Sequence, residues 1–562
     1  MAELTPVETR MGDAAFVRHC SFSGLQARLP LRWPPLPDTP PSPKRSYRSN
    51  YVYRGHADLA AWHNWQHLSD FDLVLRLVDF SALRPVLAQL LGWSSPRGRR
   101  PFDPLSMFLL VSWQVVNGWS RAELLRNLQD PRYADYRQRF GFQDQDPTEG
   151  GVRYFLTTVG LNAMAKEERV TVALDHGQTL TIALHYLNHL LAASVGVIRE
   201  ADLVSPEAWE KALVCPDGMI HDAASRRRCA FVQASCYQPV TDAASRPCPA
   251  QEKDKPGCEC DSLACAVSCR HAPARDPEAR CIVYTGCNGS EGGMDGATAA
   301  QGRGDLRYGY RSVALQFAEP LRRFSFVLLD DFLPANAREE NPAAALLLQL
   351  ARFYPDLQLD VVAGDAGLGY YSFLHAAYQR GAKRVVDLRA DPSDKLKAQW
   401  PIRGYNEKGR PVCPFGYALT SNGFDTERQR HKWFCGQACL NGTLPLVELD
   451  EVIYPPQECA HQDPQRPHGQ IINVGETFKN GSIRLVRDIP VGTPAWKRLY
   501  HRARNASEYR NAVLEGWGWK RVSVFGEPRN RSLTALADVW LNLTTVARLV
   551  REATGASRTQ QR

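Results

Sequence analysis

The stretch Leu359–Tyr370 constrains the fold of this chain more than any other. A short β-branched run ends at Asp365, with a glycine directly before it and another two residues after it. The pattern predicts an amphipathic helix over Tyr371–Arg380 and a further strand over Lys383–Arg389. Parallel sheets with this element order present reactive groups just beyond their strand ends. We therefore expect Asp365 to be a metal-binding carboxylate with room beside it for a phosphate backbone, the alternative being an ordinary Asp-Gly turn.

Length and composition indicate a globular protein of two to four domains. The chain has 562 residues, of which 44% are hydrophobic and 23% charged. The first residues lack the pattern of a signal peptide, and the most apolar stretch, Leu187–Ile198, is too short to span a bilayer. We expect a cytoplasmic protein that does not contact membranes. In a reducing compartment, the fifteen cysteines favour metal ligands or buried thiols over disulfides.

The positive charge is concentrated near the carboxyl end. Residues 495–562 hold thirteen Lys and Arg against five Asp and Glu, an excess equal to the net charge of +8 of the whole chain. Aromatic residues are interleaved with this charge (Trp496, Tyr500, Tyr509, Trp517 and Trp519). A solvated basic face is the simplest interpretation, but the aromatic residues favour binding to nucleic acid.

The first two hundred residues divide into two parts. Residues 1–57 are rich in proline and are expected to form a poorly ordered tether. Residues 58–205 show helical patterning, with a buried helix over Leu105–Val116 and a capping box formed by Ser120 and Glu123 at the start of another helix. Short helices separated by Gly and Pro suit a helix-turn-helix-like bundle, which would make this part a DNA-binding domain.

The remainder predicts an α/β fold of the ribonuclease-H-like type. The first strand pattern ends at Asp217, and two more cover residues 308–319 and 324–332. A helix and the strand that leads to Asp365 follow. In the ribonuclease-H-like order, three antiparallel strands come first, and parallel strands joined through helices follow. The predicted core has a first part over 206–390 and a second part, with basic helices, over 486–562. Two cysteine-bearing insertions interrupt it, at about 226–306 and at 391–485.

Three acidic residues occupy the places where such a sheet would hold metal ions. Two-metal phosphoryl transfer requires carboxylates around two Mg²⁺ or Mn²⁺ ions. Asp217 is the candidate on the first strand, with Asp222 as its rival, Asp365 is the candidate on the fourth strand, and Glu508 is the candidate on a late helix. Arg504 and Tyr500 precede Glu508 by four and eight residues, so all three lie on one helical face. An ordinary solvated Arg–Glu pair is the alternative for this helix.

The combined pattern resembles the DDE transposases of bacterial insertion sequences, in the group with a Tyr/Arg/Glu signature. The segments that carry the resemblance are Phe102–Phe142, Asp217–Ser225, Gly309–Ser312, Pro334–Ala337 and Gly364–Gly367. The resemblance implies that Asp217, Asp365 and Glu508 bind Mg²⁺ or Mn²⁺ and that Arg504 supports the site. It also implies a homodimer that bridges two double-stranded DNA ends, cleaves at terminal inverted repeats and transfers the strands into target DNA.

Two positions depart from the family pattern. Tyr500 stands four residues before Arg504 rather than three, and Glu515 occupies a place where the family has lysine. We expect Lys520, Arg510 or Arg521 to make the DNA contact of that lysine. Two alternative functions remain open: a ribonuclease-H-like nuclease that cuts without joining, and a decayed transposase that only binds DNA.

Two cysteine clusters are candidate structural zinc sites. The first comprises Cys258, Cys260, Cys265 and Cys269 with His271 nearby, and free thiols are the alternative interpretation for it. The second comprises Cys413, Cys435, Cys439 and Cys459, with His461 two residues after the last cysteine. This second set resembles the small zinc-stabilised module that some family members carry in their insertion.

Overall fold

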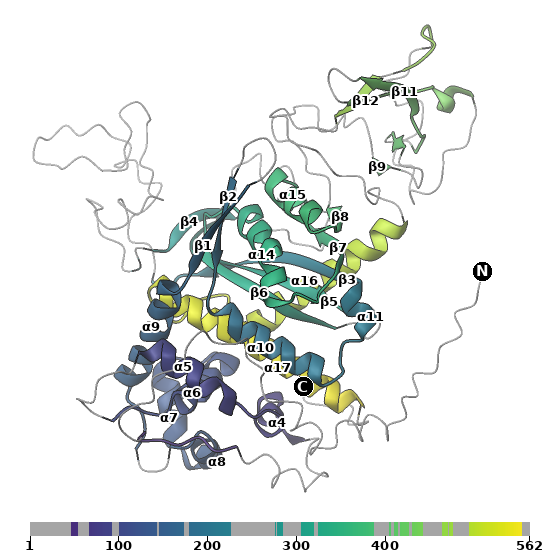
Figure 1. The fold of residues 1–562 in the computed structure, drawn as a ribbon. Coiled ribbons are helices and arrows are strands. Elements are labelled where there is room, and N and C mark those ends of the chain that lie inside the picture. The colour runs from purple at the N-terminus through teal and green to yellow at the C-terminus, as the bar shows by residue number, and fades with distance from the viewer. Residues whose placement is uncertain are drawn as a thin grey trace, which may run out of the picture.

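We describe the protein from a computed structural model (Figure 1). The structure describes residues 47–53, 67–92, 100–142, 145–173, 179–225, 276, 278–284, 305–319, 324–386, 404–405, 410–413, 416–425, 430–441, 464–469, 471–475 and 494–553. The predicted proline-rich segment 1–57 and the first cysteine cluster therefore lie almost wholly outside the described residues.

A mixed sheet of six strands forms the centre of the described fold (Figure 1). Strand β3 (Ala212–Asp222) pairs antiparallel with β5 (Asp305–Ala318), and β5 pairs antiparallel with β6 (Ser325–Pro334) and β4 (Arg280–Tyr284). The other edge of β3 pairs in parallel with β7 (Leu359–Gly364), which pairs in parallel with β8 (Lys383–Val386). These pairings confirm the predicted mixed α/β sheet.

The first strand is longer than the sequence pattern predicts. β3 does not end at Asp217 but continues for five more residues, because residues 218–222 stay paired with β5 as far as the Asp222–Gly309 pair. Gly309 permits this close pairing, since a Cβ atom there would lie 1.9 Å from the carbonyl oxygen of His221. Asp217 consequently lies in the middle of a strand.

Helices cover the two faces of the sheet differently. Helix α16 (Pro494–Gly516) packs on one face, against Leu213 and Cys215 of β3 and Val361 and Ala363 of β7. Helices α14 (Glu340–Phe353) and α15 (Tyr371–Gln379) connect β6 to β7 and β7 to β8, as parallel pairing requires. α14 and α15 also pack against each other in the main hydrophobic core.

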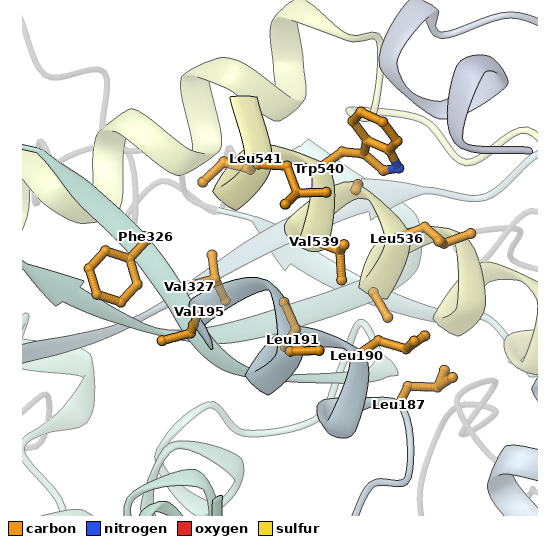
Figure 2. Packing of buried hydrophobic residues seen from close by; sticks show 14 of the residues in the cluster. Leu187, Leu190, Leu191, Val195, Phe326, Val327, Leu536, Val539, Trp540 and Leu541 are labelled. Carbon is orange, nitrogen blue, oxygen red and sulfur yellow. The ribbon is translucent and has the colours of Figure 1, made fainter. Parts of the chain in front are cut away.

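Two further helices protect the edge strand β6. The Asn542 amide in α17 (Glu527–Ala553) bonds both the N–H and the carbonyl of Val327, at 2.7 and 2.8 Å. Asn188 in α10 (Asn188–Glu200) does the same for Asp330, at 2.9 and 3.0 Å. Leucines and valines of both helices pack in the main hydrophobic core beside Phe326 and Val327 of β6 (Figure 2). The hydrogen-bonding edge of β6, which no other strand covers, is thus closed by side chains.

The amino-terminal helical region packs on α17. It contains α4 (Asp70–Leu77), α5 (Arg84–Leu91), α6 (Pro104–Asn117), α7 (Arg121–Gln129), α8 (Ala134–Arg139), α9 (Glu149–Ala165) and α11 (Pro206–Glu210), with short 3-10 turns at Ser81–Leu83 and Pro131–Tyr133. The buried helix and the capping box of Ser120 and Glu123 are confirmed. The prediction of a helical region over residues 58–205 is wrong at residues 168–184, where β1 (Glu168–Ala173) and β2 (Thr179–Leu184) form an antiparallel hairpin.

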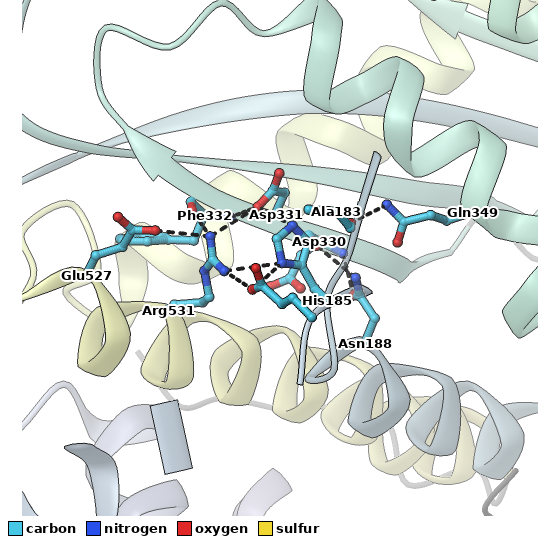
Figure 3. A network of polar contacts seen from close by, with 10 residues as sticks. Ala183, His185, Asn188, Asp330, Asp331, Phe332, Gln349, Glu527 and Arg531 are labelled. Atoms are coloured by element: carbon cyan, nitrogen blue, oxygen red, sulfur yellow. Dashed lines mark hydrogen bonds and ion pairs between the residues drawn. The ribbon is translucent and has the colours of Figure 1, made fainter. Parts of the chain in front are cut away.

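A buried ionic network fixes the end of this hairpin to the core (Figure 3). His185 lies 2.8 Å from both Glu167 and Asp331, so its ring bridges the residue before β1 and the edge strand β6. Arg531 of α17 pairs with the same two carboxylates and also with Glu527. Hairpin, sheet and α17 are therefore held together by charges that are almost wholly removed from water.

The second predicted insertion contains small sheets of its own. β11 (Thr420–Asp425), β12 (Arg430–Phe434) and β13 (Ile471–Gly475) form an antiparallel sheet beside the short pair β9 (Gly404–Tyr405) and β10 (Pro411–Val412). A 3-10 turn at Ala438–Asn441 lies between β12 and β13 in the chain.

Within the described ranges, α17 is the one helix long and apolar enough to cross a membrane. Of its most apolar window, 94% is buried inside the fold. The core helix of a soluble protein passes the same test, so α17 is weak evidence for a membrane protein.

Candidate active site

Asp217 lies in β3, and Asp365 directly follows β7, the strand that pairs in parallel with β3. The parallel pairing aligns Val214 of β3 with Val362 of β7, and each aspartate comes three residues after its valine. Side chains alternate along a strand, and the residues two before each aspartate, Cys215 and Ala363, belong to the cluster under α16. Both carboxylates are therefore placed at the α16 side of the sheet, where β7 ends.

The surroundings of Asp217 are polar but shielded from water. Asp217 is 9% exposed, and Asn511 of α16 donates a hydrogen bond of 3.0 Å to its Oδ2 atom. Burial raises the pKa of Asp217 while the Arg504 guanidinium lowers it, and the nearby charge of Asp365 raises it again. The net effect is a raised pKa, as expected for two carboxylates that share a site.

Helix α16 connects Glu508 to this pair through Arg504. Arg504 lies 3.6 Å from Oδ1 of Asp217 and 3.4 Å from Oε1 of Glu508, so one guanidinium contacts both acids. The Glu508 side chain is 63% exposed, which places it at the solvent side of the site. The predicted helical face is thus correct for Arg504 and Glu508. Tyr500, one turn before Arg504 in the same helix, stacks on Trp496 with ring centroids 4.3 Å apart and packs against the buried cluster between α16 and the sheet.

A fourth carboxylate, which the sequence reasoning missed, also reaches this site. Glu339 lies at the amino end of α14, and a Cβ atom added to Gly218 would be 2.5 Å from its Oε1 atom. Burial and the charge of Asp217 raise the pKa of Glu339 to about 7, against the opposing effect of Arg311. Adjacent glutamates before a helix ordinarily stabilise the helix start, so nothing in the local sequence distinguishes Glu339.

The structure separates Asp217 from its rival Asp222. Asp222 forms an ion pair with Arg307 at 2.7 Å, and its backbone pairs with residues 520–522. It is five residues along β3 from Asp217, an odd spacing that directs its side chain to the opposite face. Asp217 is consequently the better placed of the two to act with Asp365.

One predicted DNA contact is wrong, and two others remain accessible. Arg510 is completely buried and pairs with Asp538 at 2.7 Å, so it has no surface on which to meet DNA. Lys520 is 58% exposed and lies 3.0 Å from Glu515, and Arg521 is also exposed.

The basic carboxyl-terminal segment is less available to DNA than its composition implies. Trp496 and Trp519 are buried. Arg531 and Arg551 are also buried in ion pairs, with Glu167 and Asp70. Much of the interleaved charge and aromatic surface therefore serves the core of the protein.

Three of the four cysteines in the second candidate zinc set gather in one small core. Cys413 is buried there with Tyr417 and Trp433, and Cys435 and Cys439 pack against the same cluster. Cys459 and His461 lie outside the described residues. The zinc assignment for this set therefore remains a prediction.

The carboxylates of Asp217 and Asp365 suit a divalent cation in two respects: they are negatively charged, and one of their oxygen atoms lacks a hydrogen-bond partner. Oδ1 of Asp365 is buried and makes no hydrogen bond, which is costly for a carboxylate unless a cation binds it. As the side chains now stand, no group of three His, Cys, Asp or Glu in the described part of the chain is close enough to hold a metal ion. Exposed Glu508 would therefore have to move inward to complete a three-carboxylate site.

Comparisons of the chain with protein-family models, with curated proteins and with solved structures found no match.

Proposed function

We propose that the chain is a DNA transposase of the DDE type, which uses divalent cations to cleave phosphodiester bonds and to join the freed 3′-hydroxyls to target DNA. The observation that carries this proposal is that Asp217 and Asp365 each come three residues after a valine of the last recorded pair, Val214–Val362, between the adjacent parallel strands β3 and β7. The strand order β6, β5, β3, β7, β8 supports it, because this is the order of a ribonuclease-H-like sheet.

Each residue of the site has a role in this proposal. Asp217 and Asp365 bind Mg²⁺ or Mn²⁺, and Glu508 joins them from α16. When bound, such ions activate the attacking oxygen and stabilise the leaving oxygen. Asn511 fixes the rotamer of Asp217 through its 3.0 Å hydrogen bond. Arg504 compensates the negative charge of Asp217 and Glu508 and holds them on the same side of the sheet.

Lys520 and Arg521 supply accessible positive charge for the DNA. They follow α16 directly, on the segment that pairs with the end of β3. Exposed basic side chains bind phosphates and position a duplex without reading its sequence. In this proposal the protein acts as a homodimer on two DNA ends.

A strand-transfer assay tests the proposal. The purified protein is incubated with Mg²⁺, duplexes taken from the DNA that flanks its gene, and a plasmid target. We expect joined products from the parent protein and none from Asp365→Asn. Asp360→Asn is the matched control, because Asp360 lies on the same strand but pairs with Lys383 at the surface. Joining by Asp365→Asn at the parental level would refute the proposal, and cleavage without joining would support the nuclease alternative.

A further inference from the structure

The outer face of α16 carries three exposed side chains that lead toward the proposed site. Arg498, His501 and Asn505 follow one another at spacings of three and four residues, so they lie on the same helical face as Glu508. We call these three residues the α16 stripe. From Arg498 to Glu508 the helix rises by about 15 Å, at about 1.5 Å per residue.

The helix itself supplies no negative charge to balance the stripe. Between Pro494 and Ser507, α16 contains only basic and neutral residues. Arg498 and Arg502 are four residues apart, a spacing at which like charges destabilise a helix. Because exposed helices ordinarily intersperse both signs of charge, the stability of α16 does not explain this pattern.

Other parts of the described chain do not neutralise the stripe either. Arg498 and Asn505 form no ion pair or hydrogen bond with any described residue. The His501 ring lies against Tyr500, with ring centroids 5.9 Å apart. Arg502, which is not part of the stripe, instead donates a hydrogen bond of 2.6 Å to the backbone carbonyl of Glu319. The stripe is therefore available to an anion from outside the protein.

The stripe is continuous with the proposed site. Arg504 lies between Asn505 and the sheet and contacts both Asp217 and Glu508. The pairing of β3 with β7 is recorded only as far as Val214, so the edge of β3 beside Asp217 is open on that side. Successive phosphates of one DNA strand advance by about 3.4 Å along the duplex axis, so the length of the stripe matches about four nucleotides.

We propose that the α16 stripe binds the sugar–phosphate backbone of the DNA strand that is cleaved at the open edge of β3. Arg498 supplies positive charge, and the Asn505 amide donates a hydrogen bond to the backbone. Contacts of this kind position a strand without reading its sequence. The inference rests on the proposed function and deepens it, because it identifies the surface that receives the DNA beside the site.

DNA binding measured without divalent cations tests the inference. The full chain is titrated into a fluorescently labelled duplex at several NaCl concentrations, and binding is followed by fluorescence anisotropy. One phosphate contact contributes about 0.9 to the slope of log K against log salt, which corresponds to roughly eightfold in affinity between 1 M and 0.1 M salt. We expect Arg498→Glu to lower the slope by about this amount or more and to weaken binding accordingly.

Arg352→Glu is the matched control, because it changes the net charge equally. Arg352 is exposed at the end of α14, on the face of the sheet opposite to α16. We expect it to bind DNA like the parent. An equal loss in both variants would overturn the inference, because binding would then follow net charge alone.

Asn505→Lys tests the inference in the opposite direction. The added positive charge should steepen the salt slope by about 0.9 and tighten binding at 0.1 M salt, a gain that misfolding cannot produce. Gln379→Lys, at the exposed end of α15, is its control and should bind like the parent. A parental slope in Arg498→Glu or in Asn505→Lys would overturn the inference. If the parent itself fails to bind the duplex, the proposed function fails, which is a distinguishable outcome.

Discussion

The buried histidine of the hairpin network gives a prediction whose magnitude follows from the structure. Burial alone would lower the pKa of His185, but the carboxylates of Asp331 and Glu167 raise it from 6.5 to about 9. One pH unit corresponds to about 1.4 kcal/mol, so the charged ring stabilises the fold by about 3 kcal/mol. Because the folded pKa is the higher one, this stability is complete below pH 6.5 and is lost as the pH rises through about 9.

The perturbation is His185→Gln, and the assay is differential scanning calorimetry at pH 6.5 and pH 10. Unfolding entropy of about 2 cal/mol/K per residue converts 3 kcal/mol into a Tm change on the order of 3 °C for a chain of this size. At pH 6.5 the parent should melt well above the variant, because the variant leaves two buried carboxylates without a positive ring between them. At pH 10 the difference in Tm should be smaller by about 3 °C.

His189→Gln is the matched control for this experiment. The His189 ring lies against Tyr186 and Phe353. Its effect on Tm should be similar at the two pH values. A difference between the parent and His185→Gln that does not change from pH 6.5 to pH 10 would refute the assignment of a charged His185.

Three further predictions concern the sheet that carries the site. Asn542→Ala should destabilise the fold by about 2–5 kcal/mol, because it leaves both backbone groups of Val327 buried and unbonded; an unchanged denaturation midpoint would contradict the edge-closing role. Gly309→Ala should destabilise by about 1–3 kcal/mol through collision with a backbone oxygen, whereas Gly196→Ala, with nothing within 4 Å of the added methyl, should be neutral or stabilising in the same melting assay. Asp222→Asn should retain DNA joining within a few-fold of the parent and Asp217→Asn should abolish it, and the reverse ranking would show that the rival aspartate is the ligand.

The strands and their order could be predicted because each has a clear local pattern. The run before Asp365 and the strand of Asp217 are apolar and β-branched, and short flexible segments separate the elements that follow. The aspartates belong to those patterns, so their placement on neighbouring strands followed from the predicted order. The β1–β2 hairpin was missed because its six-residue strands pair only with each other, between two long helices.

The errors at the site concern contacts between residues far apart in the chain. Arg510 looks like a surface cation on a basic helix, and only the fold shows that Asp538, on the next helix, neutralises it. Glu339 looks like an acidic residue at a helix start, and its approach to Gly218 depends on how α14 meets β3. Periodicity reports which face of an element is buried, but it does not report which element covers that face.

We propose that Asp217 and Asp365 bind a divalent cation at the open edge of β3. Crystals of the protein grown with Mn²⁺ test it directly, because Mn²⁺ is located by its anomalous scattering. We predict a Mn²⁺ peak in contact with both carboxylates that disappears in Asp365→Asn. A well-ordered site with no peak there in Mn²⁺-saturated crystals, or a peak unaffected by Asp365→Asn, would contradict the claim.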